Sequence, residues 1–224
     1  MSLFAGFAVL VAEVGLSIYN RVHAHSFGIY GAGEVGKTTL HRQLRTRGEV
    51  PEIKKRTDGL QRPTRKVVKI DGELKTVKSS DVGGQAQYWI QWIEDMRKRK
   101  VEYIIFMIDN RHNEEAFNLD NQLAWRFLVD TILDTHWRNG KKAKKKKEKD
   151  YPTAVGIWAN KFDLWGSKYG DFNGEPNQHP IFEPFNMGIQ QLNEIGIPCH
   201  KYVMSAKSDP EMVYRGVMTM IKDY

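Results

Sequence analysis

The sequence contains a single cysteine, Cys199, in 224 residues. One cysteine cannot form an intramolecular disulfide, which excludes the disulfide-stapled scaffolds of small secreted proteins and agrees with a reducing compartment. No group of histidines and cysteines has the spacing of metal ligands, so a zinc-finger pattern is excluded too. The length instead suits one globular domain with appendages.

Positive charge is scarce outside one segment. The formal net charge is +7, and residues 141–149, with seven lysines and one glutamate, contribute +6 of it. The rest of the chain therefore carries only +1, which argues against a basic surface spread over the fold. No aromatic residue interleaves with these lysines, so we expect no nucleic-acid partner. A solvated loop, contact with anionic lipid headgroups and contact with an acidic protein are the alternatives for this lysine-rich insert.

Long apolar runs are scarce as well. The one such run, residues 3–18, is interrupted by Glu13 and Ser17 and has no basic residue before it. A secretory signal peptide needs that basic region, and a transmembrane helix needs about 20 apolar residues, so residues 1–22 fit neither pattern well. Glu13, Ser17 and Asn20 would share one helical face, which favours an interfacial membrane helix. A short spanning anchor and a helix packed on its own domain are the alternatives.

Lipidation signals are also lacking. Ser2 stands where N-myristoylation needs glycine, and residues 222–224 form no prenylation box. We therefore expect membrane attachment to depend on residues 1–22. Arg21 follows the apolar run, so residues 23–224 are expected on the cytoplasmic face of the membrane.

Strands alternate with helices over residues 23–224, and the strands are predicted at residues 27–30, 66–70, 74–79, 103–108, 154–159 and 201–204. Asp71-Gly72 is a hairpin signal between two of the strands. This pattern predicts an α/β three-layer fold with a mostly parallel six-stranded sheet, one antiparallel hairpin strand and helices on both faces. The segment from Trp165 to Pro184 is rich in Gly, Pro and Asn and is expected to be a loop. Ligands of such sheets bind beyond the carboxyl ends of the strands, where four short motifs fall.

The first motif, G-A-G-E-V-G-K-T, is a complete GxxxxGK[ST] phosphate-binding loop between a predicted strand and a predicted helix. Backbone N–H groups and the positive end of the helix bind phosphates there, and glycines are needed where a Cβ would collide with the ligand. Lys37 would reach the β- and γ-phosphates, and the Thr38 hydroxyl would bind Mg²⁺. The expected nucleotide-binding residues of this motif are Gly31, Ala32, Gly33, Glu34, Val35, Gly36, Lys37, Thr38 and Thr39.

The second motif is D-V-G-G-Q at residues 81–85. Asp81 ends a predicted strand and suits the acidic residue that holds Mg²⁺ through a water. Gly84 would offer its backbone N–H to the γ-phosphate. Gln85 would orient the attacking water.

Two further motifs suit a guanine base. Asn160-Lys161-Phe162-Asp163 follows a buried strand, and Asp163 would accept hydrogen bonds from the guanine N1 and N2 groups, which adenine lacks. The stem of Lys161 would lie over the base. Ser205-Ala206-Lys207, after a later strand, would offer backbone N–H groups to the guanine O6.

The order and content of these motifs resemble those of a Ras-superfamily small GTPase over residues 26–224. D-V-G-G-Q resembles the branch shared by Arf-like GTPases and heterotrimeric G-protein α subunits, and G-A-G-E-V-G-K-T is nearer the α subunit. No helical domain fits between Thr38 and the hairpin, so the architecture expected from the resemblance is the smaller, Arf-like one.

The resemblance implies a further Mg²⁺ ligand, a threonine that precedes the hairpin. Thr64 is the preferred candidate because Pro63-Thr64 directly precedes the hairpin strand, while Thr57 keeps the closer spacing to Lys37. The implied catalytic set is then Gln85, Lys37 and Thr64, and the metal ligands are Thr38, Thr64 and Asp81. The α subunit carries an arginine three residues before its threonine. Gln61 stands there in this chain, so no cis arginine is expected, and Gly33 leaves space for a partner's arginine.

The function expected from the resemblance is a membrane-attached molecular switch that binds GTP or GDP with Mg²⁺ and hydrolyses GTP slowly. It implies three protein partners: a GTPase-activating protein, an exchange factor and an effector that binds the switch loops. A non-hydrolysing receptor subunit resembling the signal-recognition-particle receptor β subunit is the alternative, against which Gln85 argues. An ATPase of another P-loop class is the second alternative, against which Asp163 argues.

The topology also predicts which segments share a face. Parallel strands begin at the edge opposite the motifs, and the chain enters its first strand just after Arg21. Residues 1–22, the lysine-rich insert at 141–149 and the Asp71-Gly72 turn are therefore expected together, on the face opposite the nucleotide.

Overall fold

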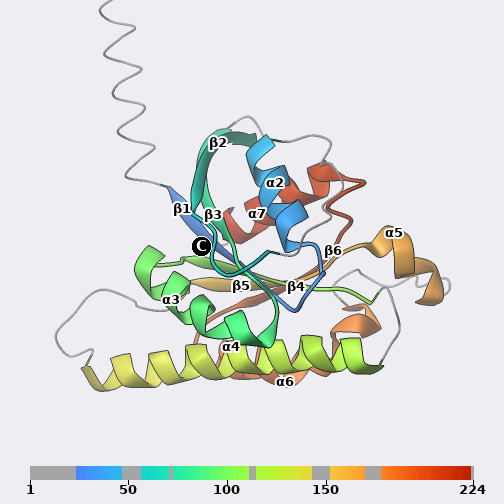
Figure 1. Ribbon diagram of the computed structural model, residues 1–224. Coiled ribbons are helices and arrows are strands. Elements are labelled where there is room, and N and C mark those ends of the chain that lie inside the picture. Colours follow the sequence, from blue (N-terminus) through green and yellow to red (C-terminus); the bar gives the residue numbers. More distant parts are fainter. Residues whose placement is uncertain are drawn as a thin grey trace, which may run out of the picture.

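The computed structural model describes residues 24–46, 57–70, 73–110, 115–142, 152–169 and 178–222. These residues form an α/β fold around a six-stranded sheet with the order β2-β3-β1-β4-β5-β6 (Figure 1). The β2–β3 pair is antiparallel and every other pair is parallel. The predicted fold class, with its six strands and one antiparallel strand, is confirmed at this level.

The strands lie close to where the apolar runs predicted them. They are β1 (His25–Tyr30), β2 (Thr64–Ile70), β3 (Glu73–Asp81), β4 (Tyr103–Ile108), β5 (Ala154–Ala159) and β6 (Cys199–Val203). All six residues of β4 and of β5 are buried. This is expected of central parallel strands with helices on both faces, whose sequences are continuously apolar.

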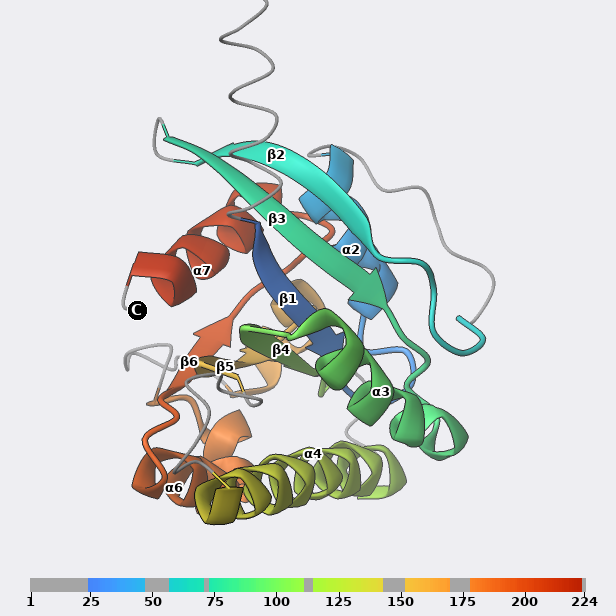
Figure 2. The same ribbon diagram turned by 90° about the vertical axis from the view of Figure 1, so that its left-hand side faces the viewer.

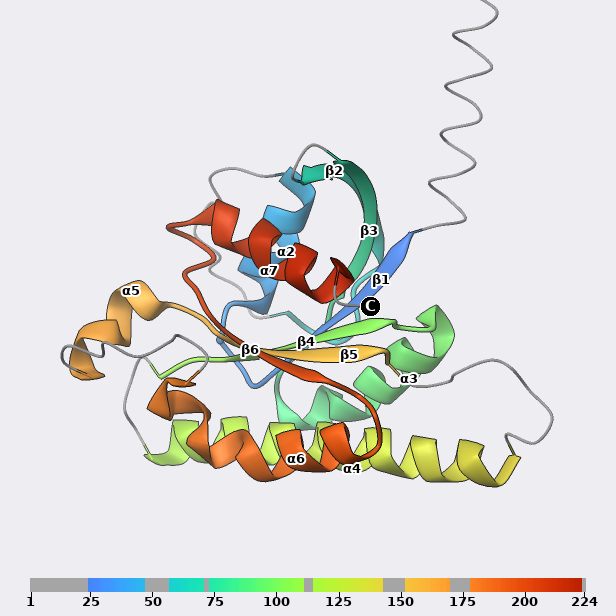
Figure 3. The same cartoon turned by 180° about the vertical axis from the view of Figure 1, so that it is seen from behind.

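Helices cover both faces of the sheet (Figures 1 and 3). The α2 and α7 helices lie on one face, and α3, α4 and α6 lie on the other. The helical segments are α2 (Lys37–Thr46), η1 (Ala86–Tyr88), α3 (Trp89–Arg99), α4 (Glu115–Lys142), α5 (Phe162–Trp165), η2 (Gly166–Tyr169), η4 (Pro180–Phe185), α6 (Asn186–Glu194) and α7 (Pro210–Lys222).

The segment predicted as a loop between Trp165 and Pro184 differs from that prediction. Short helical turns, η2 and η4, occupy much of its described part. The Trp165 ring is fully buried and packs edge-on to His179, with ring centroids 5.5 Å apart. Glycine and proline content favoured a loop, but burial of these rings gives short turns tertiary support that propensity alone does not provide.

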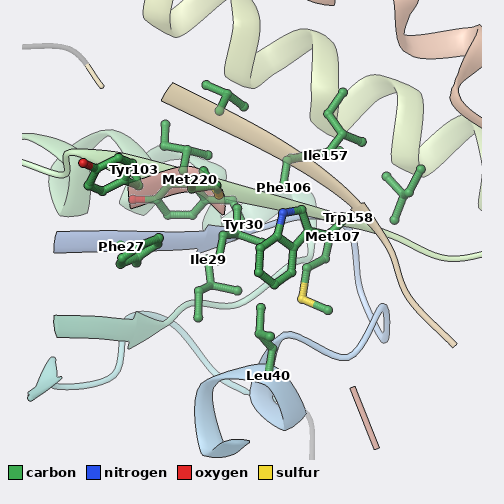
Figure 4. Close-up of a cluster of buried hydrophobic side chains, with 14 of the residues drawn as sticks. Phe27, Ile29, Tyr30, Leu40, Tyr103, Phe106, Met107, Ile157, Trp158 and Met220 are labelled. Atoms are coloured by element: carbon green, nitrogen blue, oxygen red, sulfur yellow. The ribbon is translucent and has the colours of Figure 1, made fainter. Parts of the chain in front are cut away.

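The core lies between the sheet and its helices, and Figure 4 shows one cluster of it around β1, β4 and β5. The Phe27 and Tyr103 rings stack at 5.0 Å between their centroids, joining β1 to β4. Burial of one aromatic or aliphatic side chain of this size stabilises the folded state by about 1.5–3 kcal/mol. The core therefore holds β1 rigidly, and with it the loop that follows.

Strand order reverses around β1. After β1 the chain forms β2 and β3 on one side of that strand and then crosses to β4 on its other side. In open α/β sheets the carboxyl ends of strands at such a switch point form the ligand-binding crevice. The four motifs follow β1, β3, β5 and β6, so they all emerge at this edge.

Candidate nucleotide-binding site

The loop after β1 has the backbone of a phosphate cradle. Gly31 has a φ of +137°, and a Cβ there would lie 2.2 Å from the Met107 carbonyl oxygen. Gly36 has a φ of +98°, and a Cβ there would lie 2.2 Å from Asn160 Nδ2. Only glycine fits these two positions without strain, because φ is positive and a Cβ would be too close to residues at the ends of neighbouring strands. The α2 helix begins at Lys37 directly after the loop and directs its positive end there.

The outer part of the loop is open. A Cβ built on Gly33 would meet no atom within 4 Å, which agrees with the space expected beside the γ-phosphate. The neighbouring Glu34 is exposed and has a φ of +62°. Its backbone carbonyl joins the base motif, as described below.

Lys37 is buried, and its ammonium donates to the carbonyl oxygen of Ala32 at 2.5 Å. Burial lowers the pKa of Lys37 to about 8, although Asp81 opposes the shift. A bound anion stabilises a buried cation more than it stabilises a solvent-exposed cation, because the attraction is weaker in water. This setting suits the role that the motif predicts for Lys37.

Three oxygen-bearing side chains meet beside the loop. Thr38 Oγ1 donates to Asp81 Oδ2 at 2.7 Å, and Thr57 Oγ1 donates to the same oxygen at 3.0 Å. The two hydroxyl oxygens are 3.0 Å apart. Asp81 Oδ1 is buried and has no hydrogen-bond partner within the described part of the chain. A carboxylate with one orphaned oxygen beside two hydroxyls fits a hard cation such as Mg²⁺.

Thr57, and not Thr64, joins this cluster, so the preference for Thr64 needs correction. Thr64 lies in β2, where its hydroxyl is 3.4 Å from His41 Nε2. Thr57 is brought to Asp81 because the next residues run antiparallel to the end of β3, with Leu60 bridged to Val82. Of the two candidates, Thr57 is therefore the one that lies beside Asp81.

A signal for Thr57 was present in the sequence as Gly59, two residues further on. Gly59 has a φ of +68° and its carbonyl accepts a hydrogen bond from Gly83 N–H at 3.0 Å. A glycine at this point allows the chain to turn onto the D-V-G-G-Q segment, and the turn carries the preceding threonine toward Thr38.

The glycines of D-V-G-G-Q lie against the phosphate cradle, and two tryptophans of α3 bind their carbonyl groups. The indole N–H of Trp89 donates to the Gly84 carbonyl at 2.9 Å, and that of Trp92 donates to the Gly83 carbonyl at 3.1 Å. With both carbonyls bound to α3, the Gly84 segment is fixed close to Lys37. Gln85, half-buried, follows at the start of η1.

We expect Gly84→Ala to weaken hydrolysis strongly. A Cβ at Gly84 would lie 2.3 Å from both the Ala32 carbonyl oxygen and Lys37 Nζ, so the loop would be displaced from the cradle. Loss of one backbone donor to developing charge typically lowers kcat by about 10²- to 10³-fold. Single-turnover GTP hydrolysis measures the change. Met187→Ala, at an exposed position of α6 outside the site, is the control, and an equal loss in both variants would contradict the assignment.

Asn160 joins three parts of the site. Its Nδ2 donates to the Val35 carbonyl in the phosphate loop at 2.9 Å, and its Oδ1 accepts from Ala206 N–H at 2.9 Å. The side chain is buried, and its carbonyl accepts from the Trp165 indole at 2.6 Å. Asn160 therefore fixes the phosphate loop and the two base motifs in one constellation.

Lys161 also connects separate parts of the site. Its ammonium donates to the Glu34 carbonyl at 2.5 Å and pairs with Asp109 at 2.6 Å. Asp109 is buried at the end of β4, and the sequence analysis did not single it out. The signal that could have found it is its place directly after a buried parallel strand, because such strand ends gather at one edge.

The remaining base-motif residues lie together. Asp163 N–H donates to Ser205 Oγ at 3.0 Å, which joins α5 to the segment after β6. The Asp163 side chain is exposed, Ala206 is buried, and Lys207 is exposed. This leaves the carboxylate accessible to a base that enters between the two motifs.

Comparison with protein-family models and with curated proteins found no match for this chain. The functional assignment therefore depends on the motifs and on the geometry that they adopt. Thr39, at the start of α2, and Ala32 complete the predicted set; Thr64 is the one predicted residue that the structure keeps away from the cluster it was assigned to.

Proposed function

We propose that the protein is a guanine-nucleotide-binding switch of the Ras-superfamily type that hydrolyses GTP to GDP. One observation carries the proposal: Asn160 bonds at once to the phosphate loop and to the Ser205-Ala206-Lys207 segment. Phosphate-binding and base-reading elements are therefore parts of one rigid site. Asp163 beside Ser205 supplies the chemistry that favours guanine over adenine.

The chain's own groups account for each task in this proposal. The N–H groups of the cradle and Lys37 bind the β- and γ-phosphates. Gly84 N–H donates to the γ-phosphate, and Gln85 orients the attacking water. Catalysis of this kind is positioning and charge stabilisation, so no covalent intermediate on the protein is required.

Thr38 and Thr57 would hold Mg²⁺, with Asp81 acting directly or through a water. When bound, the ion neutralises charge on the β- and γ-phosphate oxygens. Within the described residues there is no group of three or more His, Cys, Asp or Glu side chains that could hold a metal. A Mg²⁺ site completed by waters and nucleotide phosphates does not need one.

The partners of the switch remain those implied by the motifs: an activating protein, an exchange factor and an effector. With Thr57 as the threonine, the position three residues earlier is Lys54, so a cis arginine is lacking with either choice. An activating arginine from a partner, entering beside Gly33, would raise the rate by about 10³- to 10⁵-fold.

Membrane attachment through residues 1–22 is the second part of the proposal, motivated by their apolar sequence. These residues lie outside the described ranges. Among the helices that are described, none combines the length and hydropathy that crossing a bilayer demands.

Competition titrations test the nucleotide class. GTP and GDP should compete for the site in the presence of Mg²⁺, and ATP should compete at least about 10⁴-fold less well. Equal competition by ATP would contradict the proposal. Single-turnover hydrolysis, with and without candidate activating proteins, separates a slow GTPase from a non-hydrolysing receptor subunit.

Mg²⁺ dependence should distinguish the two threonines. Thr57→Ala removes a hydroxyl from the cluster with Thr38 and Asp81, and we expect the Mg²⁺ concentration needed for GTP binding to rise about 10- to 100-fold. Thr64→Ala is the control, expected within about twofold of wild type. Mg²⁺ titrations of GTP binding give both values, and a larger effect at Thr64 would restore the original assignment.

A further inference from the structure

The β2–β3 hairpin is a second positively charged segment, in addition to the lysine-rich insert. Residues 64–81, which form β2, the turn and β3, contain five basic and three acidic residues and carry a net charge of +2. The chain outside residues 141–149 carries +1 in total, so the remainder outside both segments is −1. The net positive charge outside the lysine-rich insert is therefore concentrated on the hairpin.

Basic side chains on the hairpin lie opposite one another. Arg65 and Lys78 are direct cross-strand partners, and like charges in that arrangement are destabilising. Burial, Arg99 and Arg65 lower the pKa of Lys78, while Asp95 opposes the shift. Arg65 and Lys66 are exposed, and Val67 between them and the tip is 41% exposed. An external anion would relieve this repulsion.

The hairpin extends past the start of β1. His25, the first residue of β1, pairs with Val77, so the beginning of β3 and its partners in β2 continue beyond it (Figure 2). The described part of the chain starts at Ala24, the residue before His25. Residues 1–23 therefore join the domain next to the cationic hairpin.

The lysine-rich insert joins the domain at the same edge. The α4 helix runs back from the nucleotide edge and ends at Lys142, at the edge where the parallel strands begin (Figures 1 and 2). The apolar segment, the seven-lysine segment and the cationic hairpin are thus all connected at the face opposite the phosphate cradle. The interiors of the first two segments lie outside the described residues.

We propose that the β2–β3 hairpin is a membrane-docking surface that binds the anionic headgroups of a lipid bilayer. An acidic protein could match the charge, but the apolar segment that joins the domain beside the hairpin favours a bilayer. An apolar anchor gives stable attachment only with a second signal, and a basic surface next to it is such a signal. The proposal rests on the proposed membrane attachment but not on nucleotide hydrolysis.

Flotation of the full-length chain on vesicles tests the hairpin. The background carries glutamine for every lysine of residues 141–149, so that this insert does not mask the hairpin. Vesicles are pure phosphatidylcholine or phosphatidylcholine with 30% phosphatidylserine. The test variant is Arg65→Gln with Lys66→Gln, and the matched control is Arg126→Gln with Arg215→Gln, which removes two exposed cations elsewhere.

Loss of the hairpin cations should lower partition onto the anionic vesicles by about 30-fold at low salt. Partition onto neutral vesicles should be unchanged, and the control should match its background on both. Equal anionic partition of the test and control variants overturns the proposal. In that case, selective loss of polyglutamate binding by the test variant would assign the hairpin to an acidic protein.

Failure of the anchor is recognised separately. Deletion of residues 1–20 should abolish binding to neutral vesicles, and retained binding would contradict the anchor while leaving the hairpin test intact. GTP binding measured on the same samples reports a folded nucleotide site independently of lipid.

Discussion

Asp163→Asn should exchange guanine for xanthine selectivity. In the proposed site the carboxylate of Asp163 would accept from the N1 and N2 groups of guanine, whereas an asparagine amide offers one acceptor and one donor. Xanthine carries an oxygen at position 2 that can accept from the new amide. A site built for such hydrogen bonds rejects a ligand that lacks their partners by about 10⁴-fold, so GTP affinity should fall by about this factor and XTP should become the preferred ligand.

The geometry keeps this effect specific to the base. The Asp163 backbone N–H, not its side chain, bonds to Ser205, so the substitution leaves the connection between α5 and the last motif in place. Competition titrations with GTP, XTP and ATP measure the exchange. Asp130→Asn, on the exposed surface of α4, is the matched control. Retained GTP preference in the Asp163 variant would mean that another group reads the base.

Lys37→Ala should lower affinity for GTP and GDP by about 10²- to 10³-fold. The Lys37 ammonium is buried in the cradle, where the phosphates would be its only multiply charged partners. Isothermal titration gives the affinities, and Lys98→Ala, on the exposed part of α3, is the control. Thermal unfolding without nucleotide checks the fold. Removal of a desolvated cation should not lower the unfolding temperature.

Gln85→Leu should separate binding from hydrolysis. Its side chain is assigned to the attacking water and not to the nucleotide, so GTP affinity should stay within about twofold while the single-turnover rate falls by about 10²-fold or more. Parallel loss of affinity in the Gln85 and Lys37 variants would contradict these separate roles. An unchanged rate in Gln85→Leu would favour the non-hydrolysing receptor subunit.

The sequence predicted the sheet well because its signal is local. Continuous apolar runs placed β4 and β5 at the residues where the structure has them, and Asp71-Gly72 marked the hairpin between β2 and β3. The turns around His179 were missed because their stability comes from aromatic packing across the chain. Such contacts have no local period to read.

The composition of the site followed from its motifs for a similar reason. A phosphate loop needs glycine where φ is positive and the backbone lies close to a neighbouring strand. The glycines at positions 31 and 36 therefore already indicate the conformation of the loop. The order of the four motifs along alternating strands placed them at one edge of the sheet. By itself, the sequence therefore determined the fold class, the edge of the sheet at which the candidate site lies and the residue types of its four motifs.

Only the tertiary structure decided which threonine joins Asp81 and which acidic group holds Lys161. The sequence favoured Thr64 and left Thr57 as the alternative. It could not decide between them, because loop residues have no period and their distance to a site depends on how the chain turns. The bridge between Leu60 and Val82 brings Thr57 to Asp81, while pairing in β2 turns Thr64 toward His41. Asp109 meets Lys161 only because β4 and β5 are neighbours in the sheet, a contact between segments far apart in the chain.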